Sequence, residues 1–423
     1  MKAIISGGSR PEGKVRVSGA KNSATRLLAA ALLTDENVSL SNFPTRLVDV
    51  GHKVRFINAM GGKVVLDHEN DLASIDAGGY GYRALPDFDV PIRTTYLLVA
   101  GQILRSGKAI IPYPGGCKIG SRGYDMHVLV WEKLGCTVTE GEDGITVEGS
   151  NFVGNTIAFP ISTVGGTENA LLCGAIASGT TEILNAYITP EVEDLLKLLR
   201  RMGAEIEVFG NSHIKIEGKA SLSGARAKVM PDRIEALTWI AYGVLTNGNL
   251  LIEDVPFDSM QVPLLYLQSA GLDMLSNSNS ILIRPESAGS QSVKPIEVPC
   301  GAHPGVISDM QPFYVILAAA ASGVSRIYDY RYPERIGYID ELSKFCASGT
   351  LQAEKGRIYV EGPVRFKPAE ATSTDLRGSM ALILAALCAD GESVVNQAEM
   401  ALRGYNDLTG KLKKLGATLD IEE

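Results

Sequence analysis

A cysteine, a lysine and an arginine lie close together in a glycine-rich segment of this chain. Residues 114–123 read PGGCKIGSRG, so Cys117 follows two glycines and precedes Lys118 and Arg122. Glycines permit tight bends and close approach to a ligand, and an arginine offers a fixed charge for phosphate or carboxylate. Neighbouring cations also favour the thiolate form of a cysteine. The residues leave two interpretations of Cys117 open, an exposed reactive thiol or a small buried side chain.

Basic residues recur in other glycine-rich or polar segments. Each one alone fits a surface ion pair, which contributes little to stability. Together they would line a cleft for a multiply anionic substrate, even though the formal net charge of the chain is −8. That overall acidity argues against a nucleic-acid partner or an anionic membrane surface. The residues are Lys21, Arg93, Arg122, Arg233, Arg335, Arg377 and Arg403.

Two aspartates and one glycine-rich stretch each permit a structural and a chemical interpretation. Asp309 in HPGVISDMQ and Asp375 in STDLRGSM both precede apolar runs. Each is either a helix N-cap or a carboxylate placed as a general base. The stretch STVGGTEN is either a helix start or a set of backbone amides that bind phosphate. Its first residues are Ser162, Thr163, Val164 and Gly165.

Length and composition indicate a globular protein of two domains. The chain has 423 residues, of which 45% are apolar and 21% charged. We expect a cytoplasmic protein, because no apolar run reaches the roughly 18 residues of a membrane span and no signal peptide is visible. Six cysteines without CxxC spacing and five histidines without ligand spacing predict neither a disulfide framework nor a metal site. We expect the histidines to be structural or solvated.

The chain repeats itself at intervals of about 70 residues. Six short junctions, each typical of a helix followed by a strand, carry this repeat. A second series of turns runs in step with them, so each unit reads helix, strand, helix, strand, with further strands between. The six junctions begin at Met60, Leu134, Met202, Ala270, Ala347 and Leu415.

The segment EVEDLLKLLRRMG, residues 191–203, illustrates one helix of the set. Its apolar residues fall at helical spacing and its other face is charged, which predicts an amphipathic helix capped by Gly203. Six units predict two domains of three units each, with the chain crossing between them near residue 230. We expect the N-terminal strand, which precedes SGAKNSATR, to belong with the second half of the chain.

Six motifs of this chain resemble the enolpyruvyl transferases in their order and nearly in their spacing. They are SGAKN, PGGCKIGSR, PDRIEA, HPGVISDMQ, STDLR and RGY. The resemblance implies an α/β fold of two inside-out α/β barrel domains, built from six βαβαββ repeats, with the active site in the interdomain cleft. We expect the domains at 22–229 and at 1–21 plus 230–423. No metal or organic cofactor is implied.

The reaction implied is transfer of the enolpyruvyl group of phosphoenolpyruvate to an acceptor hydroxyl, with release of phosphate. The PGGC segment favours the branch of the family that acts on nucleotide sugars. The expected acceptor is the 3-hydroxyl of UDP-N-acetylglucosamine, in the first committed step of peptidoglycan synthesis. Two alternatives stay open: a paralogue that uses another nucleotide or sugar hydroxyl in specialised metabolism, and a non-catalytic regulator that binds a nucleotide sugar. The presence of a full set of catalytic residues argues against the regulator.

The resemblance implies four catalytic residues. Cys117 is expected to protonate the methylene carbon of phosphoenolpyruvate and to be alkylated by the epoxide fosfomycin. Asp309 is expected to be the general base beside the acceptor hydroxyl. Lys21 and Arg403, together with Arg122, are expected to hold the phosphate of phosphoenolpyruvate.

The resemblance also implies contacts to both substrates. Arg377 is expected to help hold the carboxylate of phosphoenolpyruvate, and Arg335 and Asp375 are counted with the same site. Asn22 and Arg93 are expected to contact the acceptor. The backbone along the nucleotide diphosphate is expected to be that of Ser162, Thr163, Val164 and Gly165.

Departures from the family's usual residues fall mostly on the acceptor side. Because they concentrate there, they bear on the choice between UDP-N-acetylglucosamine and another acceptor. The added Arg26 is expected to meet a further phosphate or carboxylate of the acceptor. The family usually has lysine, proline, lysine, leucine, proline and aspartate at the positions of Val90, Gly123, Ile161, Thr25, Arg26 and Leu402.

Overall fold

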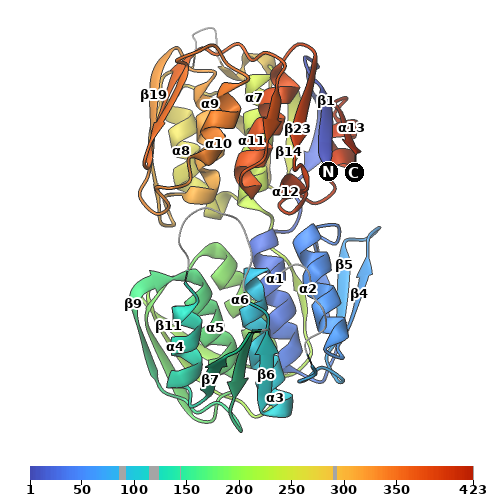
Figure 1. Ribbon diagram of the computed structural model, residues 1–423, viewed down its shortest axis with the longest axis vertical. Helices are drawn as coiled ribbons and strands as arrows, with labels where there is room; N and C mark the ends of the chain where they lie inside the picture. The colour runs from blue at the N-terminus through green and yellow to red at the C-terminus, as the bar shows by residue number, and fades with distance from the viewer. Residues whose placement is uncertain (85–91, 114–122, 143, 289–292, 423) are drawn as a thin grey trace. The chain divides into compact units, whose positions relative to one another are not determined.

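The computed structural model describes residues 1–84, 92–113, 123–142, 144–288 and 293–422. Val90, Cys117 and Arg122, which the sequence singles out, lie outside these ranges. The described chain forms two compact units (Figure 1). The first unit comprises residues 19–113 and 123–230, and the second comprises residues 1–18 and 231–422.

The described part of the first unit holds three sheets, with strand orders β13-β3-β5-β4, β6-β8-β7 and β11-β12-β10-β9. Its strands are β3 Val38–Ser41, β4 Lys63–Asp67, β5 Leu72–Asp76, β6 Lys108–Ile111, β7 Thr137–Glu140, β8 Ile145–Glu148, β9 Thr156–Thr163, β10 Thr180–Ala186, β11 Glu205–Phe209, β12 His213–Glu217 and β13 Arg226–Lys228. Its helices are α1 Lys21–Ala30, η1 Ala31–Leu33, α2 Val48–Ala59, η2 Arg93–Leu98, α3 Val99–Ser106, α4 Asp125–Lys133, α5 Val164–Ala175 and α6 Pro190–Arg201.

The second unit also holds three sheets within its described residues, with orders β22-β23-β1-β24, β15-β16-β14-β2 and β18-β17-β19-β21-β20. Its strands are β1 Lys2–Ser6, β2 Glu12–Arg16, β14 Asn249–Glu253, β15 Leu275–Ser276, β16 Ser280–Ile283, β17 Glu297–Gly301, β18 Val306–Ile307, β19 Gly323–Asp329, β20 Leu351–Glu354, β21 Arg357–Gly362, β22 Glu370–Thr372, β23 Glu392–Asn396 and β24 Thr418–Glu422. Its helices are α7 Arg233–Leu245, η3 Phe257–Ser259, α8 Gln261–Ser269, η4 Pro285–Ala288, η5 Ser308–Met310, α9 Gln311–Ala318, α10 Gly337–Ser343, α11 Leu376–Cys388, α12 Glu399–Leu402 and α13 Leu408–Lys414.

The core of the second unit is built around helices that are buried on every side. Every residue of α9 is buried, and so are nearly all residues of α7 and α11. In Figure 1 these three helices lie at the centre of the unit with strands outside them. A helix that is apolar all round needs such cover on all its faces. None of the helices in the described ranges is long and apolar enough to cross a bilayer.

The six junctions found in the sequence share one backbone conformation. At five of them a helix ends just before a glycine with positive φ, the left-handed conformation that favours glycine in helix C-terminal caps. At the other one, Gly349 has the same conformation but lies in a turn six residues after the end of α10. The strand that follows is an edge strand of its own sheet: β4, β7, β11, β15, β20 or β24. The glycines are Gly61 (φ 92°), Gly135 (92°), Gly203 (98°), Gly271 (87°), Gly349 (84°) and Gly416 (79°).

The N-terminal strands pair with the second half of the chain, as predicted. β1 lies between β23 and β24 and is antiparallel to both. β2 is parallel to β14, with Val15 opposite Ile252. The sheet that carries the C-terminus is therefore completed by the first residues of the chain.

Helix α6 confirms the amphipathic helix predicted before Gly203. Thr189 precedes it, and its hydroxyl oxygen accepts a hydrogen bond from the amide of Val192. Pro190 occupies the first helical position, where its missing N–H costs nothing. Two acidic residues of this helix, Glu191 and Asp194, are nevertheless buried, so the polar face is partly enclosed by the unit.

We predict that Thr189→Ala lowers the free energy of unfolding by about 1 kcal/mol, because the capping hydrogen bond of α6 is lost. Thr189→Ser is the matched control, since it removes the methyl group but keeps the hydroxyl. Urea denaturation of the three proteins tests this. Equal losses in the alanine and serine variants would assign the effect to the methyl group and contradict the capping role.

Candidate functional site

Arg335 joins two carboxylates in the second unit. Its side chain is 2% exposed, and it donates from Nη1 to Oδ1 of Asp309 at 2.7 Å and from Nη2 to Oδ1 of Asp375 at 2.8 Å. Nη1 also donates to the carbonyl oxygen of Ser308 at 3.0 Å. Burial opposes the charged guanidinium, but the two carboxylates raise the pKa of Arg335 above its ordinary value. The group stays charged and fixes the direction of Asp309.

Asp375 is the N-cap of α11, which confirms the capping interpretation. Its Oδ1 accepts hydrogen bonds from the amides of Arg377 and Gly378, both at 3.1 Å. The same oxygen accepts from Arg335. This carboxylate, 4% exposed, therefore anchors an arginine to the start of a helix.

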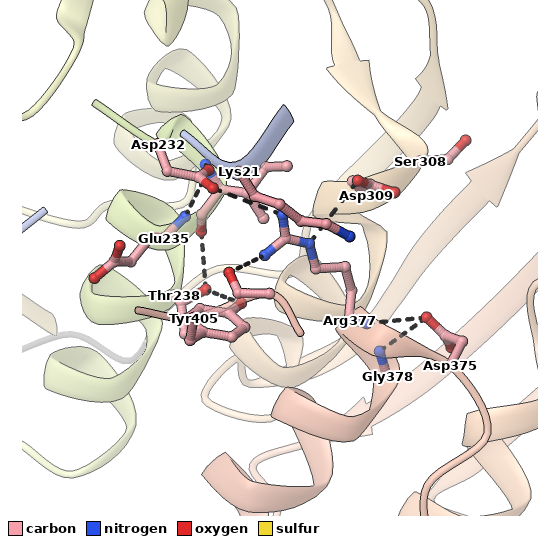
Figure 2. A network of polar contacts seen from close by, with 12 residues as sticks. Lys21, Asp232, Glu235, Thr238, Ser308, Asp309, Asp375, Arg377, Gly378 and Tyr405 are labelled. Atoms are coloured by element: carbon pink, nitrogen blue, oxygen red, sulfur yellow. Dashed lines mark hydrogen bonds and ion pairs between the residues drawn. The ribbon is translucent and has the colours of Figure 1, made fainter. Parts of the chain in front are cut away.

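Arg377 is a second buried arginine, and it reaches the other oxygen of Asp309 (Figure 2). Its Nη2 lies 3.7 Å from Oδ2 of Asp232, and its Nε lies 3.9 Å from Oδ2 of Asp309. Nη1 donates to the carbonyl oxygen of Gly404 at 3.3 Å, and the guanidinium lies 5.3 Å from the ring centroid of Tyr405. Asp309 is 30% exposed, whereas Arg377 is 1% exposed. Asp309 is thus the solvent-facing end of a buried charged network.

Asp232 caps the neighbouring buried helix α7. Its Oδ1 accepts from the amides of Ile234 at 2.8 Å and Glu235 at 3.2 Å. Burial raises the pKa of Asp232, while the charge of Arg377 lowers it. Sequence reasoning missed this residue, although its position directly before an apolar run in PDRIEA is a capping signal.

The remaining predicted arginines of the second unit lie close to this network in the sequence. Arg403 is the C-cap of α12 and directly precedes Gly404, whose carbonyl oxygen accepts a hydrogen bond from Arg377. Arg403 is partly buried. Arg233 is the first residue of α7 and is fully buried, with Nη1 3.3 Å from Nδ1 of His303.

Lys21 is the first residue of α1 in the first unit. Its Nζ lies 2.8 Å from Oδ2 of Asp49, in the first turn of α2, and its side chain is 15% exposed. Asn22 follows it and is partly exposed. Asp49 was not singled out from the sequence, because nothing local in LVDVGH distinguishes it from an ordinary acidic first-turn residue.

The stretch STVGGTEN begins a helix, as one of its two interpretations predicts. Thr163 ends β9 and caps α5, and its Oγ1 accepts from the amide of Gly166 at 3.3 Å. The first amides of a helix have no intrahelical partner and carry a partial positive charge. The four residues predicted to bind the diphosphate lie at this end and are partly exposed: Ser162, Thr163, Val164 and Gly165.

Arg93 and His127 lie near this helix start. Arg93 donates from Nη2 to the carbonyl oxygen of Gly123 at 2.8 Å. A Cβ atom on Gly165 would lie 3.1 Å from Nε2 of His127, so the ring packs against the α5 start. Burial, together with the charges of Arg93 and Arg26, lowers the pKa of His127 to about 3. His127 is therefore neutral and buried, which fits the expectation that the histidines are structural or solvated.

An open groove of about 650 Å³ lies on the first unit, next to Gly123. It is bounded by one side of α4 and by residues of β9. Its lining combines apolar side chains with carboxylates. The residues are Gly123, Tyr124, Asp125, Met126, Val128, Leu129, Glu132, Glu140, Ala158 and Pro160.

Arg26, which the sequence predicts to meet an anion of the acceptor, forms an ion pair within the first unit. Its Nε donates to Oε1 of Glu168 at 2.8 Å, and its Nη1 donates to Oγ1 of Thr25 at 2.9 Å. The side chain is 14% exposed and Glu168 is 1% exposed. The positive charge of Arg26 is thus neutralised within the unit by the carboxylate of Glu168, which is distant in the sequence. Ile161, another departure, is 58% exposed, and Leu402 packs against the core of the second unit.

The described residues thus bring the predicted groups together in two sets. The second unit combines Asp309 with Arg335, Arg377 and Asp375. The first unit holds Lys21 in an ion pair and presents the start of α5. No group of three histidine, cysteine, aspartate or glutamate residues suited to a metal ion occurs in the described part of the chain. The placement of Cys117 and Arg122 lies outside that part.

We predict that the protein loses stability as the pH falls from 6.5, because of His127. The folded-state pKa is about 3 and the ordinary value is 6.5. Between these values only the unfolded chain binds the proton, so acid favours unfolding, by about 2 kcal/mol at pH 5 for this residue. In His127→Phe this contribution should vanish. Urea denaturation of both proteins at pH 7.5 and pH 5 measures it, and an equal loss in both would exclude His127 as the cause.

Comparisons with known proteins agree with this arrangement. The family model described as EPSP synthase (3-phosphoshikimate 1-carboxyvinyltransferase) matches residues 5–412. A UDP-N-acetylglucosamine 1-carboxyvinyltransferase from Koribacter versatilis is 35% identical over 423 residues, which are 99% of this chain and 96% of the relative.

Solved structures extend the comparison to the fold. The crystal structure of the enolpyruvyl transferase NikO from Streptomyces tendae matches with a TM-score of 0.87 and 26% identity, over 99% of this chain and 98% of that one. An EPSP synthase from Acinetobacter baumannii, at 18% identity, shares the mixed α/β fold with a TM-score of 0.71, over 100% of this chain and 99% of that one. The chain belongs to the EPSP synthase family of enolpyruvyl transferases.

Proposed function

We propose that this protein transfers the enolpyruvyl group of phosphoenolpyruvate to the 3-hydroxyl of UDP-N-acetylglucosamine and releases phosphate, the first committed step of peptidoglycan synthesis. Relatives that are 34–35% identical over nearly the whole chain bear the name of that activity. The observation that carries the proposal is the setting of Asp309, a partly exposed carboxylate held by Arg335 and Arg377. A cytoplasmic location is part of the proposal, since both substrates are metabolites of that compartment.

In this proposal Asp309 takes the proton of the acceptor hydroxyl. Cys117 gives a proton to the methylene carbon of phosphoenolpyruvate, which makes the neighbouring carbon electrophilic, and the acceptor oxygen bonds to that carbon. Loss of a proton from the new methyl group and departure of phosphate then restore the double bond. Fixed charges around the reacting groups favour such a step because they need no reorganisation. Arg335 and Asp375 serve as positioning residues for Asp309.

Binding of the substrates is assigned to the remaining cations and to helix starts. Lys21, Arg122 and Arg403 hold the phosphate of phosphoenolpyruvate, and Arg377 helps to hold its carboxylate. Asn22 and Arg93 contact the acceptor. The start of α5 binds the diphosphate, since first-turn amides suit a phosphate group. The groove beside Gly123 takes the nucleotide base, because its apolar walls suit a flat ring and its carboxylates accept hydrogen bonds.

The finer architecture is part of the same proposal. The six glycine junctions and the six sheets of the described residues support six βαβαββ repeats. We assign three repeats to an inside-out barrel at residues 22–229, and three to a second such barrel at residues 1–21 plus 230–423. The central buried helices with strands outside them support this assignment for the second unit.

A second candidate function uses the same chemistry on a different nucleotide or sugar hydroxyl. Ile161, with 58% exposure, presents an apolar side chain directly before the predicted diphosphate segment. Arg26 and Glu168 form an ion pair behind the same segment. These features lie on the acceptor side, which favours an altered acceptor over an altered reaction.

Phosphate release from phosphoenolpyruvate, measured with a panel of nucleotide and sugar acceptors, separates the two candidates. We predict turnover with UDP-N-acetylglucosamine and a loss of about a hundredfold or more in kcat for Asp309→Asn, because the general base is removed. Asp420→Asn, the same change at an exposed residue of β24, is a control outside the proposed machinery. Turnover with another acceptor but none with UDP-N-acetylglucosamine would overturn the first candidate and establish the second.

We predict that fosfomycin inactivates the protein by alkylating Cys117 alone. The five other cysteines are poor nucleophiles: burial raises the pKa of Cys136 and Cys346 to about 11 and that of Cys388 to about 12. Burial also raises the pKa of Cys173 and of Cys300 well above the ordinary value. Peptide mapping after treatment checks the prediction, since only the thiolate reacts.

The Cys117→Asp variant is the matched control for this labelling. It keeps an acid at the position, so it should retain phosphate release while escaping inactivation. A label on any of the five described cysteines, or a protein that stays unlabelled and fully active, would contradict the assignment of Cys117.

A further inference from the structure

A lysine without solvent exposure lies in the interior of the first unit. Lys53, on α2, is 0% exposed, and its Nζ donates to the carbonyl oxygens of Thr25 and Thr94, the latter at 3.1 Å. Lysine is almost never buried fully unless its ammonium group is satisfied. Its hydrogen bonds connect α2 to α1 and to η2, two elements that are distant in the sequence.

Arg26 and Glu168 lie beside this lysine and complete a buried polar cluster. Glu168, on α5, accepts from Arg26 at 2.8 Å. Burial lowers the pKa of Lys53 well below its ordinary value; the charge of Arg26 lowers it further, and that of Glu168 raises it. A buried ion cluster is usually no more stabilising than apolar side chains of the same volume. The cluster as a whole is therefore expected to contribute little net stability.

Two members of the cluster, Arg26 and Glu168, and one hydrogen-bond partner of Lys53, Thr94, lie next to residues of the proposed acceptor site. Arg26 is one helical turn after Asn22 on α1, and Glu168 is one turn after Val164 on α5, so each pair shares a helix face. Thr94 follows Arg93 directly. The cluster thus ties together the three elements that carry the acceptor contacts of this unit.

The phosphoenolpyruvate side of the unit has a separate anchor on the same helix. Asp49 and Lys53 are one turn apart on α2, and Asp49 pairs with Lys21 at 2.8 Å. Lys53 holds the carbonyl oxygen of Thr25, one turn after Lys21 on α1. Two contacts in succession therefore join α1 to α2, the first at the phosphate-binding lysine and the second at the cluster.

We infer that Lys53, Arg26 and Glu168 are specificity-determining positioning residues, which set acceptor affinity by fixing Asn22, Arg93 and the start of α5 relative to one another without touching substrate. The inference rests on the proposed function for the identity of the acceptor. It differs from the sequence-based expectation that Arg26 itself binds an anion of the acceptor.

Lys53→Met tests the inference, because methionine matches the length of the side chain without its charge or donors. We expect an acceptor KM raised about tenfold, with kcat and the KM of phosphoenolpyruvate changed by less than about twofold. Its unfolding midpoint should fall, because the buried carbonyl oxygens of Thr25 and Thr94 lose their hydrogen-bond donor. Glu168→Gln should act in the same direction. In the Lys53→Met/Glu168→Gln double variant, the acceptor KM should rise by less than the product of the two single increases, because the two residues act as one unit.

Arg105→Met is the matched control in the same unit. Arg105 is 13% exposed, pairs with Asp35 at 2.8 Å and donates to the carbonyl oxygen of Thr34 at 2.7 Å. Its loss should lower the unfolding midpoint and leave both KM values unchanged. Equal rises of both KM values in Lys53→Met would show general loosening of the unit and overturn the inference.

Hydrogen exchange of the ligand-free protein tests the positioning role without any acceptor. Lys53→Met should speed amide exchange in residues 92–98 and 164–168, whereas Arg105→Met should not. Unchanged exchange there, together with an unchanged acceptor KM, would refute the inference. The proposed function is judged separately by wild-type turnover of UDP-N-acetylglucosamine, and the variants are assayed with whichever acceptor the wild type uses.

Discussion

Two guanidinium groups without access to water determine how the polar residues of the second unit are arranged. An arginine cannot lose its charge in a protein, so Arg335 and Arg377 each require nearby carboxylates. Two of those carboxylates, Asp232 and Asp375, are already fixed as N-caps of the buried helices α7 and α11. Capping therefore places the carboxylates, the carboxylates place the arginines, and the arginines orient Asp309. A local rule about helix ends thereby sets the direction of the one group in this network that faces solvent.

Helix starts have a comparable role in the first unit, with a different distribution of charge. Asp49 lies in the first turn of α2, where the helix dipole favours an anion, and it holds Lys21 at the first position of α1. Thr163 is both the last residue of β9 and the N-cap of α5, so this helix begins directly where the strand ends. Unsatisfied amides and fixed cations thus occur at the same ends of helices. Both suit ligands that carry several negative charges.

Much of this organisation follows from patterns that are local in the sequence. The six glycine junctions, the capping role of Asp375 and the helix that ends before Gly203 all depend on neighbouring residues, and all three were predictable. Pairings between distant elements were not. Arg26 and Glu168 are separated by 142 positions, and no local pattern near either residue indicates the other, so their ion pair was not predicted from the sequence. Lys53 had no signal at all, because a lysine in a helix normally predicts an exposed face. Family resemblance supplied roles for Asp309 and Arg335, but not the contacts that hold them.

The position of β1 has a consequence for synthesis of the chain on the ribosome. This strand is synthesised before β23 and β24, the two strands that flank it in the sheet. The sheets of the first unit can form while translation continues, whereas β1 has neither of its neighbours until β23 and β24 have been made. The N-terminal segment, with its alternating apolar residues Ala3 and Ile5, must meanwhile wait without a partner. Its final pairing closes a loop of nearly the whole chain, which makes it a non-local and therefore slow event, and during this wait an unpaired strand is exposed to chaperones and to other nascent chains.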